Sequence, residues 1–256
     1  MAKTYTTKGI ILKRRDYHEH DRLFCIYTKD YGKIDVLAKG TKKIVSKFNP
    51  YLEPFYLVDL MIAKGKIFDK LANANIVKTF SNLRSNLNGF FILNYLSEAI
   101  DNLILGQTTQ TNKFEILLEV LDLLDDKIIK SNDKEKLLAL ANVYIFKLLK
   151  FLGYRPEIQR CVMCHKGILL TKNIFDFSHG GIICEDCKKV CLIEDYLKIS
   201  DGAIKLLQLA EMQPLNYFNS LEAKPEDLME FNQIITKLLL VNTEKPLKSL
   251  EFAKLF

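Results

Sequence analysis

Two Cys-x-x-Cys pairs are the residues of this sequence whose types and spacing point most clearly to chemistry. Cys161 and Cys164 form the first pair, and Cys184 and Cys187 form the second pair nineteen residues later. Thiolates are soft metal ligands, and two of them separated by two residues can face one ion from a single tight turn. Two such turns complete a tetrahedron, and this spacing is typical of four-cysteine zinc sites. We therefore predict that these four cysteines bind zinc.

The predicted zinc has a structural role. A catalytic zinc keeps one coordination position open for water or substrate, and a shell of four cysteines has none. His165, His179 and Cys191 lie close enough in the sequence to replace a ligand, but four thiolates already fill the shell. The sequence also has no His-Glu-x-x-His motif, no Gly-rich phosphate loop and no deaminase His-x-Glu element. These features favour a metal that stabilises the fold.

The predicted zinc finger, residues 158–190, interrupts a helical region. Between the cysteine pairs, residues 174–184 alternate like a hairpin, with Gly180 and Gly181 at the bend. Apolar residues recur every three or four positions on both sides of this segment, which predicts helices. The expected helices cover residues 83–106, 114–129, 135–153, 201–211 and 225–241. We therefore predict an α-helical domain over residues 81–256 with the finger inserted into it.

The first 80 residues have a different pattern. Residues 8–17 read as a strand, residues 22–40 as two strands around the turn 29–32, and residues 55–77 as a pair around the turn 64–66. About five short strands with no long helix predict a small closed barrel such as the OB-fold. The predicted fold class is thus α+β and multidomain, with an N-terminal OB-fold β-barrel over residues 1–80 followed by the helical domain.

The charge of the chain is concentrated in the predicted barrel. Residues 1–80 contain 16 Lys and Arg against 8 Asp and Glu, whereas residues 81–256 contain 21 against 23. A basic domain attracts polyanions, and nucleic acid is the commonest one. A solvated surface with no specific partner is the alternative for an excess of this size.

A basic loop of the predicted barrel is the candidate nucleic-acid surface. Lysines contact phosphates, and aromatic side chains stack on bases regardless of sequence, which suits a single strand better than groove recognition. Arg14 and Arg15 follow the apolar part of the first predicted strand and extend the same basic track, while Phe48 and Tyr51 could instead pack in the barrel. The candidate DNA-binding residues are Arg14, Arg15, Lys39, Lys42, Lys43, Lys47, Phe48 and Tyr51.

The remaining features are those of an ordinary globular protein. The chain has 256 residues, 48% of them hydrophobic and 27% charged, and no run of 18 apolar residues. The first 21 residues have no apolar block of the kind found in secretory signals, so we expect a cytoplasmic protein. His18 and His20 lie beside Glu19 and Asp21 in a predicted turn, where a solvated loop is favoured over a weak metal site.

Five segments together resemble the RecO family of bacterial recombination mediators. They are GIILKRRDYHEHDRLFCIYTKDYGKIDVLAKGTKK, LEPFYLVDL, FLGYRPEIQRCVMC, GGIICEDC and EKPLKSLEF, and their order and spacing make the resemblance specific. The resemblance extends over nearly the whole chain. It implies an N-terminal OB-fold, a central helical domain and, in those members that keep the cysteines, a four-cysteine zinc finger.

The resemblance also implies a function in DNA repair and homologous recombination. Members bind single- and double-stranded DNA, anneal complementary strands and are not enzymes. With the partner RecR, in the RecF pathway, they help to load the RecA recombinase onto DNA coated by single-stranded DNA-binding protein, whose acidic C-terminal tail they contact. By position, Cys161, Cys164, Cys184 and Cys187 fall on the family's zinc ligands, and the loop from Lys39 to Lys47 falls on the surface expected to meet DNA. We accordingly expect a bacterial, nucleoid-associated protein.

This chain departs from the family in one respect, and one alternative stays open. It has Lys where members often have Arg, which keeps the charge but loses the bidentate geometry of a guanidinium. The alternative is an RNA-binding or transcription-linked module with a structural zinc ribbon. Competition between single strands of DNA and RNA would separate the two, because the 2′-hydroxyl is the main local difference.

Overall fold

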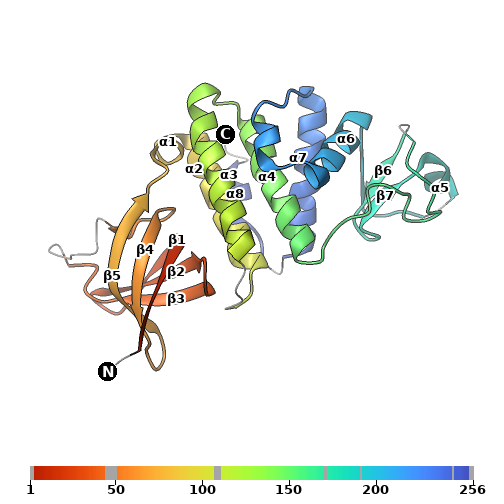
Figure 1. Ribbon diagram of the computed structural model, residues 1–256. Coiled ribbons are helices and arrows are strands. Elements are labelled where there is room, and N and C mark those ends of the chain that lie inside the picture. The colour runs from red at the N-terminus through yellow and green to blue at the C-terminus, as the bar shows by residue number, and fades with distance from the viewer. Residues whose placement is uncertain are drawn as a thin grey trace. The chain divides into compact units, whose positions relative to one another are not determined.

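The computed structural model describes residues 3–43, 51–106, 111–169, 172–190, 192–243 and 245–253 (Figure 1). By compactness the chain divides into two units: unit 1 is Met1–Asp125 with Lys248–Phe256, and unit 2 is Asp126–Leu247. The domain limits expected from the sequence, 1–80, 81–256 and 158–190, stay predictions. No helix among the described residues is both long and apolar enough to cross a membrane.

The N-terminal part of unit 1 is a closed five-stranded barrel, as predicted (Figure 1). Its strands follow the order β1-β2-β3-β5-β4, and β4 returns to pair with β1. All pairs are antiparallel except a short parallel pairing in which Val36 and Leu37 of β3 face Asp69 and Lys70 of β5. The strands are β1 (Thr4–Tyr17), β2 (Asp21–Thr28), β3 (Gly32–Ala38), β4 (Leu57–Ala63) and β5 (Asp69–Lys78).

Alternating apolar side chains fill the barrel. Because successive residues of a strand face opposite sides, every second residue points into the interior. The ring centroids of Tyr5 and Tyr31 lie 4.4 Å apart, and both rings pack against this core. The buried core residues are Ile11, Phe24, Ile26, Ile34, Val36, Ala38, Leu52, Val58, Leu60, Ile62 and Ala74.

Helices complete unit 1. The side chain of Asn86 caps α2 by accepting hydrogen bonds from the backbone N–H groups of Asn88 and Gly89. Glu98 of α2 accepts hydrogen bonds from the backbone N–H and the hydroxyl of Ser249, at 2.9 and 2.7 Å, and so holds the start of α8. The elements are α1 (Ser81–Arg84), α2 (Leu87–Leu103), the first part of α3 (Thr111–Lys130) and α8 (Lys248–Ala253).

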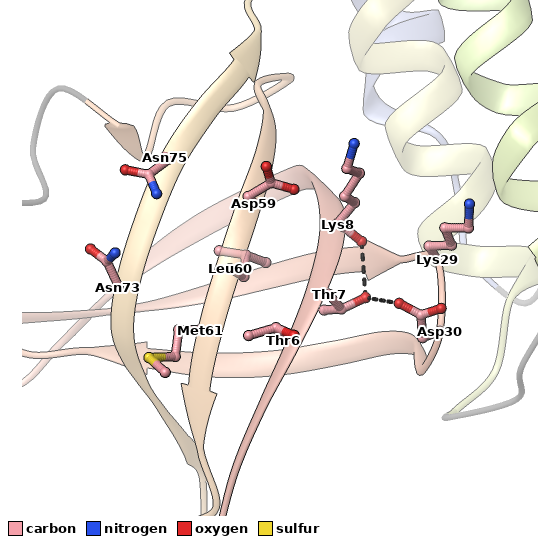
Figure 2. A pocket seen from close by; sticks show the side chains of 10 residues that line it. All are labelled: Thr6, Thr7, Lys8, Lys29, Asp30, Asp59, Leu60, Met61, Asn73 and Asn75. Carbon is pink, nitrogen blue, oxygen red and sulfur yellow. Dashed lines mark hydrogen bonds between the residues drawn. The ribbon is translucent and has the colours of Figure 1, made fainter.

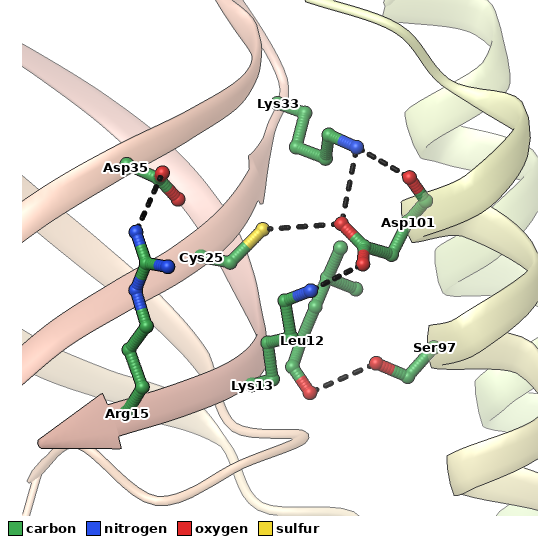
Figure 3. A network of polar contacts seen from close by, with 8 residues as sticks. All are labelled: Leu12, Lys13, Arg15, Cys25, Lys33, Asp35, Ser97 and Asp101. Atoms are coloured by element: carbon green, nitrogen blue, oxygen red, sulfur yellow. Dashed lines mark hydrogen bonds and ion pairs between the residues drawn. The ribbon is translucent and has the colours of Figure 1, made fainter. Parts of the chain in front are cut away.

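A polar network attaches α2 to the barrel (Figure 3). The pairing of β1 with β2 shifts register at Leu12, and the carbonyl oxygen of this residue accepts a hydrogen bond of 2.8 Å from the Ser97 hydroxyl. Asp101, one turn further along α2, forms ion pairs with the ammonium groups of Lys13 and Lys33. Lys33 also donates to the carbonyl oxygen of Asp101. The network therefore joins β1 and β3 to a single carboxylate of the helix.

Unit 2 is built around three long helices, α4 (Lys134–Phe151), α6 (Asp201–Met212) and α7 (Pro225–Val241). The predicted helices over 135–153, 201–211 and 225–241 are thus confirmed within one or two residues. Asn142 of α4 donates to the side-chain oxygen of Asn232 of α7 at 3.0 Å, which satisfies a buried polar pair between the two helices.

Candidate functional site

The four cysteines lie in a small three-stranded segment of unit 2. Its strands are β6 (Ile174–Asp176), β7 (Gly181–Ile183) and β8 (Tyr196–Lys198), in the order β7-β6-β8. The hairpin predicted between the cysteine pairs is confirmed as β6 and β7, with Gly180 at a positive φ of 67° in the turn. The strand β8 and the short helix α5 (Glu185–Val190) were not predicted.

The four thiol groups converge as a metal site requires. The Sγ atoms of Cys161, Cys164, Cys184 and Cys187 all lie within 4.8 Å of one another. The Sγ atoms of Cys164 and Cys184 are 3.8 Å apart. A tetrahedron with zinc–sulfur bonds of about 2.3 Å has sulfur–sulfur edges of about 3.8 Å. The donor set and its spacing therefore fit a tetrahedral metal ion.

The electrostatics of the cluster also favour a cation. Burial raises the pKa of the Cys161 thiol, but backbone N–H groups of Cys184, Cys164 and Met163 outweigh burial and lower it to about 6. The N–H of Cys184 donates to the Cys161 sulfur at 3.4 Å. Burial and the neighbouring sulfurs raise the pKa of Cys187 and of Cys184. Four thiolates at this spacing repel one another, and a bound cation would neutralise that repulsion.

The two nearby histidines are not part of the cluster found among the described residues. His165 adopts a positive φ of 59° in the turn after Cys164, and its N–H donates to the Cys161 carbonyl at 2.9 Å. The His179 ring instead makes a 2.6 Å contact with the Asp176 carboxylate. Cys191, the third residue considered as a replacement ligand, lies outside the described residues.

Gly181 allows the chain before the first cysteine pair to approach β7 closely. A Cβ atom at this position would lie 2.4 Å from the Glu157 carbonyl oxygen and 2.7 Å from a methyl group of Val162. We expect Gly181→Ala to destabilise unit 2 by about 1–3 kcal/mol, because the backbone carbonyl cannot move aside as a side chain can. Thermal unfolding measures this. Gly167→Ala is the matched control, since nothing lies within 4 Å of its added Cβ. Equal melting temperatures for the two variants would contradict the prediction.

The structure places Arg14 and Arg15 within β1, which continues to Tyr17. Neighbouring residues in a strand face opposite sides, so the two guanidinium groups start from opposite faces of the strand. Each also has its own ion pair, Arg14 with Glu53 at 2.6 Å and Arg15 with Asp35 at 3.8 Å.

The structure describes three of the four candidate lysines of the basic loop. Lys39, Lys42 and Lys43 are exposed and follow β3, in a turn that contacts the β1–β2 turn through the Lys42 N–H and the His20 carbonyl, 3.0 Å apart. The Lys42 ammonium lies 3.1 Å from Asp16 and holds the pKa of that carboxyl below its usual value.

Of the two aromatic candidates, Phe48 and Tyr51, the structure describes only Tyr51. Tyr51 is 38% exposed, which leaves part of its ring accessible. Lys47 and Phe48 lie outside the described residues. The assignment of all eight candidates to DNA contact stays a prediction.

A shallow groove of about 650 Å³ lies on the outer face of the barrel (Figure 2). Pairing of β1, β4 and β5 places Thr6, Met61 and Asn73 in one row across the strands. The next row is Lys8, Asp59 and Asn75. Two lysines and two aspartates line the groove, so it is polar but carries no net charge. The sequence alone did not reveal it, because its residues meet only through strand register.

A closed barrel joined to helices and a four-cysteine segment defines a class of multidomain proteins with an OB-like N-terminal domain. Residues 1–80 match the family model described as recombination protein O N terminal, and residues 84–251 match recombination protein O C terminal. The chain belongs to the RecO family of recombination and DNA repair proteins.

Curated relatives agree over nearly the whole chain. The DNA repair protein RecO of Dehalococcoides mccartyi strain 195 is 29% identical over 246 residues, which cover 96% of this chain and 93% of the relative. That of Roseiflexus sp. strain RS-1 is 30% identical, with 98% and 85% covered. That of Caldanaerobacter subterraneus subsp. tengcongensis is 27% identical, with 96% of each covered.

Proposed function

We propose that this chain is a non-enzymatic mediator of DNA repair and homologous recombination. It binds single- and double-stranded DNA, anneals complementary strands and helps to load the RecA recombinase onto DNA coated by single-stranded DNA-binding protein. The observation that carries the proposal is the match of both RecO family models, over residues 1–80 and 84–251. The concentration of positive charge in residues 1–80 supports it and makes the barrel the DNA-binding domain.

The proposed annealing mechanism depends on charge neutralisation and base pairing and has no covalent step. Two single strands repel each other through their phosphates, and a basic surface lowers this repulsion while the strands search for complementary register. Contacts to phosphates are independent of sequence, so either strand binds in the same way. Base pairing then converts the bound strands into a duplex without any covalent step. This chain supplies the surface and needs no nucleotide cofactor.

The metal site has a supporting role in this proposal. The four cysteines would hold a structural Zn²⁺, which would fix the turns before β6 and after β7 without an open coordination position. RecR and the C-terminal tail of single-stranded DNA-binding protein are the proposed partners, on the basis of the family. The proposed location is the bacterial cytoplasm, in association with the nucleoid.

Strand annealing tests the proposal directly. The purified full-length chain is mixed with complementary oligonucleotides precoated with single-stranded DNA-binding protein, without nucleotide cofactor, and duplex formation is followed over time. We expect annealing faster than the spontaneous rate. No acceleration by a folded, zinc-loaded protein would contradict the mediator function. Tighter binding to RNA than to DNA single strands in competition would support the RNA-binding module instead.

Reversing the charge of the turn after β3 should weaken DNA binding. We expect Lys42→Glu with Lys43→Glu to reduce the binding free energy for single-stranded DNA by about 1–3 kcal/mol, because phosphate contacts are charge-assisted hydrogen bonds. Both side chains are exposed, so the barrel should stay folded. Filter binding at low salt measures the effect. Lys205→Glu with Lys224→Glu, at two exposed positions of unit 2, is the control for net charge. Equal affinities of the two double variants would exclude this turn from the DNA surface.

A further inference from the structure

We propose that Tyr17, His18 and Phe68 form a base-stacking platform for single-stranded DNA at one end of the barrel. This inference rests on the proposed DNA-binding function and adds to it the side chains that distinguish a single strand from a duplex. None of the three residues was among the candidate DNA-binding residues predicted from the sequence. We call them the aromatic platform.

The three rings lie in contact although they come from two segments that are far apart in the sequence. The centroids of Tyr17 and Phe68 are 5.6 Å apart, with an angle of 80° between the ring planes. Those of Tyr17 and His18 are 4.2 Å apart, at 71°. Such edge-to-face packing fixes the rings in position without stacking them face to face. Tyr17 and Phe68 are partly buried, which holds the aromatic platform against the protein, and His18 is exposed to solvent.

His18 also has an unusual backbone. Its φ is 53°, a left-handed conformation that costs free energy for most residues other than glycine and asparagine. In this conformation the turn carries the imidazole ring against Tyr17. The chain thus places an exposed aromatic ring at a position where asparagine or glycine would be less strained.

Strand register brings three connecting segments to this end of the barrel. The end of β1 supplies Tyr17, the turn after it supplies His18, and the turn before β5 supplies Phe68. The segment after β3 joins them through the Gly40 N–H, which donates to the Asp21 carboxylate at 2.8 Å. In OB-folds the loops between strands 1 and 2 and between strands 4 and 5 flank the surface that binds oligonucleotides. The aromatic platform lies where these two loops meet.

The charge around the platform complements a phosphate backbone. Segments 16–22, 39–43 and 64–70 together contain seven Lys and Arg against four Asp and Glu. Two of those carboxylates serve the fold, since Asp21 binds the Gly40 N–H and Asp69 accepts from the Tyr5 hydroxyl at 2.6 Å. A net positive rim around accessible aromatic rings is the combination by which single strands are bound without sequence preference. A duplex would gain the phosphate contacts only, because its bases already stack on one another.

Two variants and one control test this inference in the full-length protein. His18→Asn removes the ring and suits the left-handed backbone, and Phe68→Leu removes the aromatic face but keeps an apolar side chain. We expect each to weaken binding to an unstructured oligonucleotide by roughly tenfold, as base–aromatic stacking requires. Duplex binding and the salt dependence of binding should stay unchanged. Phe90→Leu, at an exposed phenylalanine of α2, is the matched control.

A fluorescent base analogue reports the stacking itself. The fluorescence of 2-aminopurine in a single strand should fall when the wild-type protein or Phe90→Leu binds, and should change less with the two platform variants. If the wild type binds single strands and both platform variants bind them equally well, the platform is wrong and the DNA-binding function stands. If the wild type binds neither single strands nor duplex, both proposals fail.

Discussion

Replacing Cys161 and Cys164 by serine should abolish metal binding and unfold the segment that carries the four cysteines. The wild-type chain is expected to contain one zinc per molecule, and the double variant none. Structural zinc sites supply about 10–16 kcal/mol of apparent binding free energy in zinc-finger peptides, and this free energy stabilises the fold. The strands β6, β7 and β8 have only three residues each, so hydrogen bonds between them cannot compensate for such a loss.

Metal analysis and limited proteolysis measure this outcome. In the double variant, cleavage should begin between residues 157 and 198, while the barrel stays protected. Cys25→Ser is the control, since it removes a buried thiol that lies outside the cluster and should leave one zinc bound. A full zinc content in the double variant would contradict the assignment of these ligands.

Replacing Asp101 by asparagine should destabilise unit 1 by about 2–3 kcal/mol. The carboxylate pairs with Lys13 and Lys33, and its side chain and that of Lys33 are only 19% and 18% exposed. Removing one partner of a buried ion pair costs about 3–5 kcal/mol, and the remaining exposure reduces this value. A melting temperature lower by about 5–10 °C should follow. Asp59→Asn, at an exposed position of β4, is the control and should change stability little.

The ion pairs of Asp101 with Lys13 and Lys33 also make the stability of unit 1 depend on pH. Burial alone would raise the pKa of Asp101, but hydrogen bonds and charge from Lys13 and Lys33 hold it below its usual value. A carboxyl whose pKa is lower in the folded chain than in the unfolded chain stabilises the fold above the unfolded value, and this stabilisation is lost as the pH falls. The stability difference between wild type and Asp101→Asn should therefore shrink between about pH 5 and pH 3. A constant difference over this range would show that Asp101 acts through shape rather than charge.

The parts of the fold that were predicted from the sequence depend on local patterns. The β-branched content of residues 8–17 and the turns at 29–32 and 64–66 predicted the five strands, and the spacing of Leu and Ile predicted the long helices. The clustering of the four cysteines was also predicted, because Cys-x-x-Cys is a signature that can be read from a short segment. In each of these cases a single segment contains all the information that the prediction needs.

The parts that were missed depend on contacts between distant segments. β8 has only three residues and no alternation of its own, and it forms by pairing with β6. At the register shift, the Leu12 carbonyl accepts a hydrogen bond from Ser97, which lies 85 residues later in the chain. The aromatic platform likewise joins residues some fifty positions apart, so the pairing of Tyr17 with Phe68 leaves no trace in either local sequence.

The return of α8 to unit 1 has a mechanical consequence. Residues 4 and 253 both belong to unit 1, and Glu98 holds α8 through Ser249. When the chain is pulled at these two positions, the load passes through contacts within unit 1, while unit 2 lies outside the force path. Tension reaches the cysteine cluster only after α8 has detached. The contact between Glu98 and Ser249 must therefore break before unit 2 bears any load.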